Sequence, residues 1–97
     1  MKFRVARSAA EDLGEIWAYV AEKASIETAE RLIDSLTQRF VFLARNPEAG
    51  RRRADLRTEV RSFPAGSYRI YNRKERAGTL RILHVRHAAR DESKLFG

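Results

Sequence analysis

The sequence predicts an α+β domain in which an N-terminal strand and an antiparallel helix hairpin pack against a mainly antiparallel sheet, in the order β-α-α-β-β-β. Apolar residues recur at helical spacing from position 8 to position 43, and they alternate with polar residues from 59 to 85. Short turns join the segments of each kind. Because 97 residues are enough for one core and too few for two, we expect residues 1–97 to form a single domain.

The first strand and the first helix are predicted by local signals. Lys2–Val5 alternates polar and apolar residues, which is typical of a strand. Ser8 and Glu11 form a capping box, so a helix is expected to begin at Ser8 and to extend to about Ala24. Its apolar stripe, including a tryptophan that we expect in the core, comprises Leu13, Ile16, Trp17, Val20 and Ala24.

The second helix is expected to pack antiparallel against the first. Ser25 is a candidate N-cap, and Asn46-Pro47 ends the helix. Barely a residue or two then separates the two helices, which is typical of a hairpin. The apolar stripe of the second helix comprises Ala29, Leu32, Ile33, Leu36, Phe40 and Leu43.

The second half of the chain is expected to form three strands. After an arginine-rich loop over 46–57, the apolar period changes to two. The expected strands are 59–63, 68–73 and 79–85, and the expected turns are 64–66 and 74–78. Short turns make these strands an antiparallel meander, and the last strand, which is apolar on both faces, should lie centrally beside the N-terminal strand. Residues 88–97 are expected to form a polar tail.

The turn lengths predict a register, with Arg73 opposite Thr79 and Val60 opposite Ile70. One face of the sheet would cover the helices, and His84 would be a core histidine on that face. The residues of this covered face are Val60, Tyr68, Ile70, Leu80 and Ile82. The residues of the opposite face are Arg61, Phe63, Arg69, Tyr71, Arg81, Leu83, Val85 and His87.

The opposite face is predicted to be a partner site. It combines an apolar strip with a cationic rim, and nothing else in the chain is expected to cover it, which is typical of a binding surface. Arg61 opposite Arg69 would repel unless an anion neutralised both. The alternative is catalysis, in which His87, Arg61 and Arg81 act on a phosphodiester. Because no carboxylate pair or glycine-rich phosphate loop accompanies them, we prefer binding and assign no catalytic residues.

Composition and charge narrow the class of protein. The formal net charge is +7; residues 1–45 carry seven Lys/Arg and seven Asp/Glu, whereas residues 46–97 carry thirteen and six. This asymmetry indicates a polyanionic partner. With no cysteine and two histidines, we expect no metal site and no cofactor. No signal peptide or membrane-spanning run is evident, so we expect a cytoplasmic protein without membrane contact.

The order of elements, together with several motifs, resembles the RelE/ParE toxin superfamily of bacterial toxin–antitoxin modules, and its ParE branch most of all. The resemblance extends over nearly the whole chain. The segments that carry it are 10–13 (AEDL) with Ile16-Trp17, 29–33 (AERLI), 46–51 (NPEAGR), 60–64 (VRSFP), 68–71 (YRIY) and 82–91 (ILHVRHAARD).

The resemblance implies a small toxin that forms a hetero-oligomer with a cognate antitoxin, whose acidic C-terminal segment lies along the toxin surface. Better-known ParE members act on DNA gyrase and arrest growth, whereas RelE members cleave mRNA on the ribosome with Lys, Arg, His or Tyr on the sheet. Here Ala88 follows His87 and the predicted strand faces carry no lysine. We therefore prefer a non-enzymatic gyrase inhibitor. A ribosome-dependent endoribonuclease is the alternative, and a basic nucleic-acid-binding domain is the third possibility.

Two surfaces are assigned on this basis. The antitoxin is expected to bind the opposite face, with contacts from Arg61, Phe63, Arg69, Tyr71, Arg81, Leu83 and Val85. The cellular target is expected to bind the arginine loop and the protruding tail, with contacts from Arg51, Arg52, Arg53, Arg86, Arg90, Leu95 and Phe96.

Overall fold

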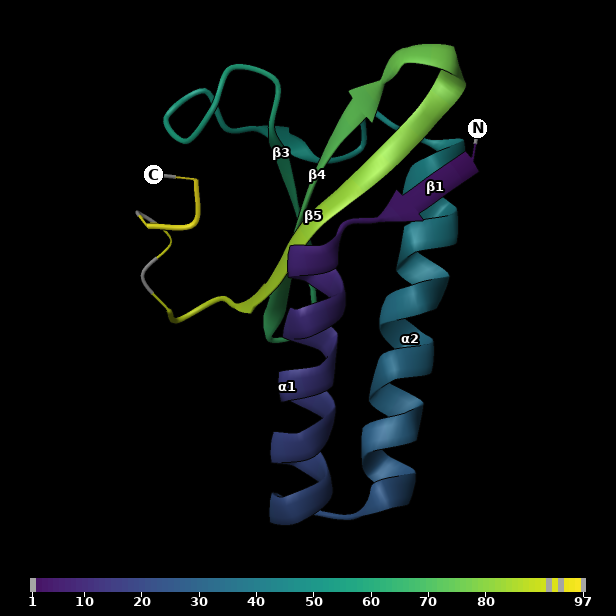
Figure 1. The fold of residues 1–97 in the computed structure, drawn as a ribbon, viewed down its shortest axis with the longest axis vertical. Coiled ribbons are helices and arrows are strands. Elements are labelled where there is room, and N and C mark those ends of the chain that lie inside the picture. The colour runs from purple at the N-terminus through teal and green to yellow at the C-terminus, as the bar shows by residue number, and fades with distance from the viewer. Residues whose placement is uncertain (1, 91, 93, 97) are drawn as a thin grey trace.

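A five-stranded sheet packs against one half of a long helix hairpin in the computed structural model, which describes residues 2–90, 92 and 94–96 (Figure 1). The elements are β1 (Lys2–Val5), α1 (Arg7–Lys23), α2 (Ile26–Arg45), β2 (Arg51–Arg52), β3 (Arg61–Ala65), β4 (Tyr68–Glu75), a 3₁₀ turn (Arg76–Gly78) and β5 (Thr79–His87). The sheet order is β1-β5-β4-β3-β2, and only β1 runs parallel to its neighbour. The predicted fold class and the central position of β5 are confirmed, and β2 is an additional strand inside the expected arginine loop.

Of the two predicted helix N-caps, the one at Ser25 is confirmed and the one at Ser8 is wrong. Ser25 caps α2 as expected, because its Oγ accepts a hydrogen bond from the Thr28 N–H at 3.0 Å. The capping box at Ser8 is wrong. Helix α1 begins at Arg7, and the Ser8 Oγ instead donates to the Leu83 carbonyl at 2.6 Å. A tertiary acceptor on β5 has therefore replaced the local partner that the sequence pattern indicated.

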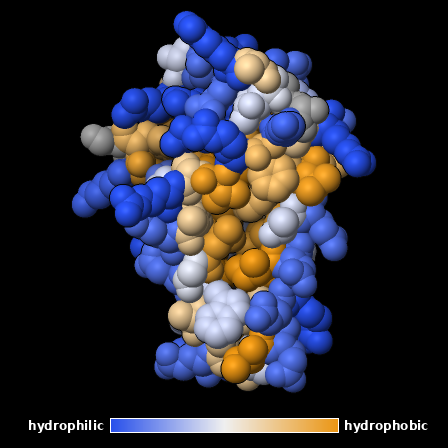
Figure 2. All heavy atoms as spheres, turned by 45° about the vertical axis from the view of Figure 1, so that its right-hand side comes forward, coloured by the Kyte–Doolittle hydropathy of each residue, from blue (hydrophilic) through white to orange (hydrophobic). Residues whose placement is uncertain are grey.

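The core lies between β5, β4 and the half of the hairpin nearest the sheet. Its buried members are Ala9, Leu36, Phe40, Leu43, Ala65, Ile70, Leu80, Ile82 and Val85. The other half of the hairpin extends beyond the sheet, which explains why Trp17 is only half-buried and lies outside this cluster (Figure 1). Apolar side chains are visible as a strip along the helical part, bordered by charged ones (Figure 2). No helix in the described part of the chain could cross a membrane.

The predicted register is wrong, because both turns are shorter than expected. A two-residue turn with Gly66 at φ +61 joins β3 to β4, and it places Phe63 opposite Ile70. The second turn uses positive φ at Ala77 and Gly78, and a bulge shifts the pairing so that Val85 also lies opposite Ile70. A slip of an odd number of residues moves every side chain of a strand to the other face.

This slip reassigns several residues between the two faces. Phe63 packs against the core and Val85 is buried in it, so neither lies on the opposite face as predicted. Arg61 shares the helix side, where its Nη1 donates to the Gly50 carbonyl at 2.9 Å. His84 is not opposite Tyr68; it pairs with Tyr71. The covered-face predictions hold for Tyr68, Ile70, Leu80 and Ile82, whereas Val60 is buried outside the core cluster.

Candidate functional site

The side of the sheet away from the helices, here named the outer face, is rich in arginine. Directly paired residues point to the same side of a sheet, so the register defines this face. Its members include Arg4, Ser62, Arg69, Tyr71, Arg73, Arg81 and His84. The predictions for Arg69, Tyr71 and Arg81 are thus confirmed as to face, whereas Leu83 falls at the bulge and has no partner in the β4–β5 register.

The outer face is not open, because the chain's own tail crosses it. The Glu92 carboxylate accepts hydrogen bonds from Arg53, from the Tyr71 hydroxyl and, at 3.3 Å, from Arg69. The expectation that nothing in the chain covers this face is therefore wrong. Glu92 and residues 94–96 reach back over the strands that the resemblance assigned to the antitoxin.

The end of the tail packs against the centre of the outer face. The Phe96 ring packs edge-on against the rings of Tyr71, at 5.9 Å, and His84, at 5.4 Å. The Phe96 carbonyl accepts hydrogen bonds from the Arg57 guanidinium, which lies in the loop before β3. Figure 1 shows the tail beside that loop. Leu95 and Phe96, expected to protrude, are both half-buried.

The three arginines of the loop, predicted as one exposed target surface, have separate roles. Arg51 and Arg52 are exposed on the edge strand β2. Arg53 is 3% exposed and pairs with Asp55 at 2.9 Å and with Glu92. Its Nη1 also donates to the Ser62 Oγ at 3.3 Å. A buried guanidinium needs such partners, so Arg53 holds the loop and the tail to the sheet and is not available to a target.

The contacts of Arg53 and Glu92 shift the pKa values of the groups that take part in them. Hydrogen bonds from the Arg53 guanidinium, aided by Tyr71, lower the pKa of Glu92 to about 2 despite its partial burial. The hydrogen bond to Asp55, followed by that to Glu92, raises the pKa of Arg53, and the hydrogen bond from Arg53 lowers the pKa of Asp55. Burial and the hydrogen bond to Glu92 raise the pKa of Tyr71. The cluster is therefore a carboxylate-binding site occupied by the chain's own carboxylate.

The lowered pKa of Glu92 predicts an acid-sensitive contribution to stability. A carboxylate whose pKa is depressed in the folded state stabilises the fold above its unfolded pKa near 4.5, and this contribution is lost as the pH falls toward about 2. Because the side chain is 21% exposed, we expect about 1–2 kcal/mol. Urea unfolding at pH 7 and pH 3 should show wild type losing more than Glu92→Gln. Equal losses would show that the tail contributes nothing.

A buried aspartate joins α1 to the free edge of β5, and the sequence analysis did not select it. The Asp12 Oδ2 accepts a hydrogen bond from the Val85 N–H at 3.0 Å and lies 2.9 Å from the His84 Nδ1. Its Oδ1 lies 3.4 Å from the Arg86 Nε. Since β1 pairs only as far as Ile82, Asp12 takes the place of a further strand partner. The sequence feature that could have pointed to Asp12 is its position as a carboxylate between Ala9 and Ile16 on the apolar face of the helix.

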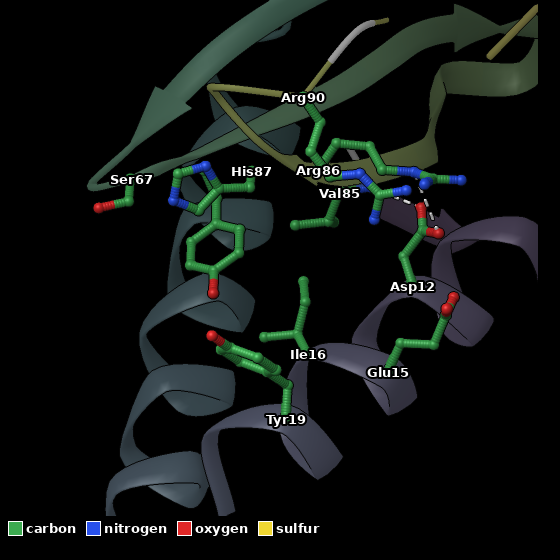
Figure 3. Close-up of a pocket in the computed structure, with 10 residues that line it drawn as sticks. Asp12, Glu15, Ile16, Tyr19, Ser67, Val85, Arg86, His87 and Arg90 are labelled. Atoms are coloured by element: carbon green, nitrogen blue, oxygen red, sulfur yellow. Dashed lines mark hydrogen bonds and ion pairs between the residues drawn. The ribbon is translucent and has the colours of Figure 1, made fainter. Parts of the chain in front are cut away.

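A pocket of about 570 Å³ lies where α1 meets the end of β5 (Figure 3). It is lined by Asp12, Glu15, Ile16, Tyr19, Ser67, Tyr68, Val85, Arg86, His87 and Arg90. The His87 and Tyr68 rings are in edge contact at 5.5 Å, and burial, followed by the charge of Tyr19, raises the pKa of Tyr68. The exposed His87 is therefore at the edge of a helix-side pocket, not on the outer face.

The alternative catalytic set is not brought together. His87 and Arg81 are six residues apart on β5, or about 20 Å at the rise of a strand. Arg61 lies on β3 against loop carbonyls, and Arg81 pairs with Glu75. The His87 Nδ1 accepts a hydrogen bond from the Ala89 N–H at 3.2 Å, which matches the structural role of a strand-end histidine.

Comparison with known proteins identifies the family. The model of the ParE toxin of the type II toxin–antitoxin system parDE matches residues 3–92. The chain belongs to the ParE toxin family. Toxin ParE1 of Mycobacterium tuberculosis is 27% identical over 90 residues, covering 93% of this chain and 92% of that protein. Toxin ParE1 of Caulobacter vibrioides is 29% identical over 89 residues, covering 91% and 93%.

The fold is shared with a solved ParDE structure. The chromosomal ParDE toxin–antitoxin system from P. aeruginosa contains a chain that matches with a TM-score of 0.78 at 21% identity, covering 90% of this chain and 95% of that one. At this level of identity the match shows the fold alone. The ParE family match extends through Glu92, so it includes the residue with which the tail binds the outer face. As a ParE-type toxin of a type II system, the chain has an antitoxin as its partner.

Proposed function

We propose that this ParE-family toxin arrests growth by binding DNA gyrase and that it acts in the cytoplasm as a binder, not as a nuclease. The observation that carries the proposal is the separation of His87 from Arg61 and Arg81, which would have to meet around one phosphodiester to cleave it. The basic C-terminal half and the family membership support binding to a large macromolecular target. The target surface comprises the exposed residues Arg51, Arg52 and Arg90 with the tail residues Leu95 and Phe96.

The antitoxin is proposed to neutralise the toxin by placing an acidic segment on the outer face. Glu92 shows which chemistry this face accepts: a carboxylate held by Arg53, Arg69 and Tyr71. An antitoxin glutamate or aspartate would take the same donors, and an apolar side chain beside it would replace Phe96 over Tyr71. In this arrangement Arg69 and Tyr71 remain antitoxin contacts and the hetero-oligomer forms through them, whereas Arg81 pairs with Glu75 and is no longer assigned to the antitoxin.

Purified toxin is expected to inhibit supercoiling by purified gyrase, and a His87→Ala variant should inhibit equally, because the mechanism needs no proton transfer. The same variant should arrest growth, with DNA synthesis stopping before protein synthesis. Supercoiling assays and pulse labelling of expressing cells measure both effects. Unaltered supercoiling would exclude gyrase as the target. Site-specific mRNA cuts on ribosomes that disappear with His87→Ala would replace this proposal with the endoribonuclease.

A further inference from the structure

Three arginines form a row across three neighbouring strands of the outer face. Arg4 on β1 lies directly opposite Arg81 on β5, and Arg81 lies directly opposite Arg73 on β4. Neighbouring strands are about 4.8 Å apart, so the row spans about 10 Å between its outer backbones. The three side chains are 68%, 33% and 44% exposed. Along β4, Arg73 lies two residues beyond Tyr71, so the row continues the outer face from the Glu92 site toward the β4–β5 hairpin.

A single carboxylate contacts all three arginines of the row. Glu75 lies 3.8 Å from Arg4, 3.4 Å from Arg81 and 3.8 Å from Arg73. Further cations lie at the same end of the sheet: Lys2 on the outer face of β1, Arg76 in the turn, and Lys74 on β4, which is opposite Leu80 and therefore on the helix side. Of these, Lys74 is paired with Glu48 at 3.3 Å. The end of the molecule at which β4 turns into β5 is hydrophilic (Figures 1 and 2).

Glu75 leaves two of the three positive charges of the row uncompensated. Like charges directly opposite one another in a sheet are destabilising, and here two such pairs share one glutamate. Arg4 and Arg73 are exposed, Arg81 is one third exposed, and in the described part of the chain all three pair with Glu75. A row of exposed arginines that repel one another is therefore better suited to a polyanion than to folding.

We propose that the arginine row, with Lys2 beside it on the outer face, binds the phosphodiester backbone of duplex DNA. Arginine presents a planar fork that matches a phosphate with two hydrogen bonds. An acidic protein is a poorer fit, because the outer-face positions from the row to the hairpin end (Lys2, Glu75 and Thr79) offer no apolar anchor. Single-stranded nucleic acid is also a poorer fit, because this patch has no aromatic side chain on which a base could stack.

This inference goes beyond the proposed function, because gyrase inhibition does not require it. The toxin would have two independent contacts, one with its protein target and one with the DNA on which that target works. The DNA contact would be independent of sequence, since phosphates and not base edges are bound.

The test compares two triple variants that remove the same charge. Arg4→Gln/Arg73→Gln/Arg81→Gln removes the row, and Lys23→Gln/Arg31→Gln/Arg45→Gln removes three exposed cations of the helix hairpin. Anisotropy of a labelled 20-bp duplex is measured at several salt concentrations. Each lost phosphate contact reduces the magnitude of the slope of log K against log salt by about 0.9. We therefore expect this slope to fall by about 2.7 in the row variant and by less than about 1 in the control.

Stability and competition measurements separate binding from folding. The row variant should unfold at the same or a higher urea concentration than wild type, because repulsion is relieved, while its duplex affinity falls at least about tenfold. An equal loss of duplex affinity in both variants would show that binding depends only on net charge and would overturn the proposal. Stronger binding to a poly-glutamate peptide or to single-stranded RNA than to the duplex, lost with the row, would also overturn it. Supercoiling inhibition, assayed separately, leaves the gyrase proposal independently testable.

Discussion

Replacing Asp12 by alanine is expected to lower the free energy of unfolding by about 3 kcal/mol. The substitution leaves the Val85 N–H, inside the core, without an acceptor, and an unsatisfied buried donor costs about 1–3 kcal/mol. It also deprives His84 and Arg86 of their common partner. Because breaking a buried ion pair by removing one partner is strongly destabilising, these losses add to the first.

Two control variants identify the source of that loss. Asp12→Asn keeps an oxygen that accepts from the Val85 N–H but loses the charge and the oxygen that faces Arg86, so we expect it to recover about half of the stability. Glu11→Ala, at an exposed neighbouring position of α1, should change stability by less than about 0.5 kcal/mol. Urea unfolding followed by circular dichroism measures all three. A change below about 1 kcal/mol for Asp12→Ala would show that α1 does not depend on this edge contact.

The fold class could be predicted because its signals are local and repeat along the chain. The stripe from Ala29 to Leu43 repeats at helical spacing within the twenty residues of α2, and the cap at Ser25 needs only the next turn of helix. The register could not be predicted in the same way. It depends on whether Pro64 belongs to a turn or to β3 and on where a bulge falls in β5, and one residue decides the face of a whole strand.

The candidate site was predicted only in part, because its decisive contacts join distant positions. Arg69 and Tyr71 were assigned correctly to the outer face from their alternation within one strand. The closure of that face needs Glu92 to meet Arg53 across 39 residues, and Asp12 to meet Val85 across 73. No periodicity links such pairs. The available signal was chemical: the arginine-rich loop needs carboxylate partners, and the tail supplies one in Glu92.

Deleting residues 92–97 is expected to abolish growth arrest and to tighten antitoxin binding by about tenfold. The deletion removes Leu95 and Phe96 from the proposed target surface. It also removes the carboxylate that competes for Arg53, Arg69 and Tyr71, and a competitor whose loss is worth about 1.4 kcal/mol accounts for a tenfold gain. Colony counts on induction and calorimetric titration with the cognate antitoxin measure the two effects.

Two further variants make the deletion interpretable. Lys94→Ala changes an exposed tail residue, so it should leave both toxicity and antitoxin affinity unchanged. Phe96→Ala keeps Glu92 in place, so it should reduce growth arrest without the full gain in antitoxin affinity. The circular dichroism spectrum of the deleted chain should match wild type, because Arg53 retains Asp55 and Ser62 as partners. Full growth arrest by the deleted chain would remove the tail from the target surface. Weaker antitoxin binding would show that the antitoxin binds the tail and does not replace it on the outer face.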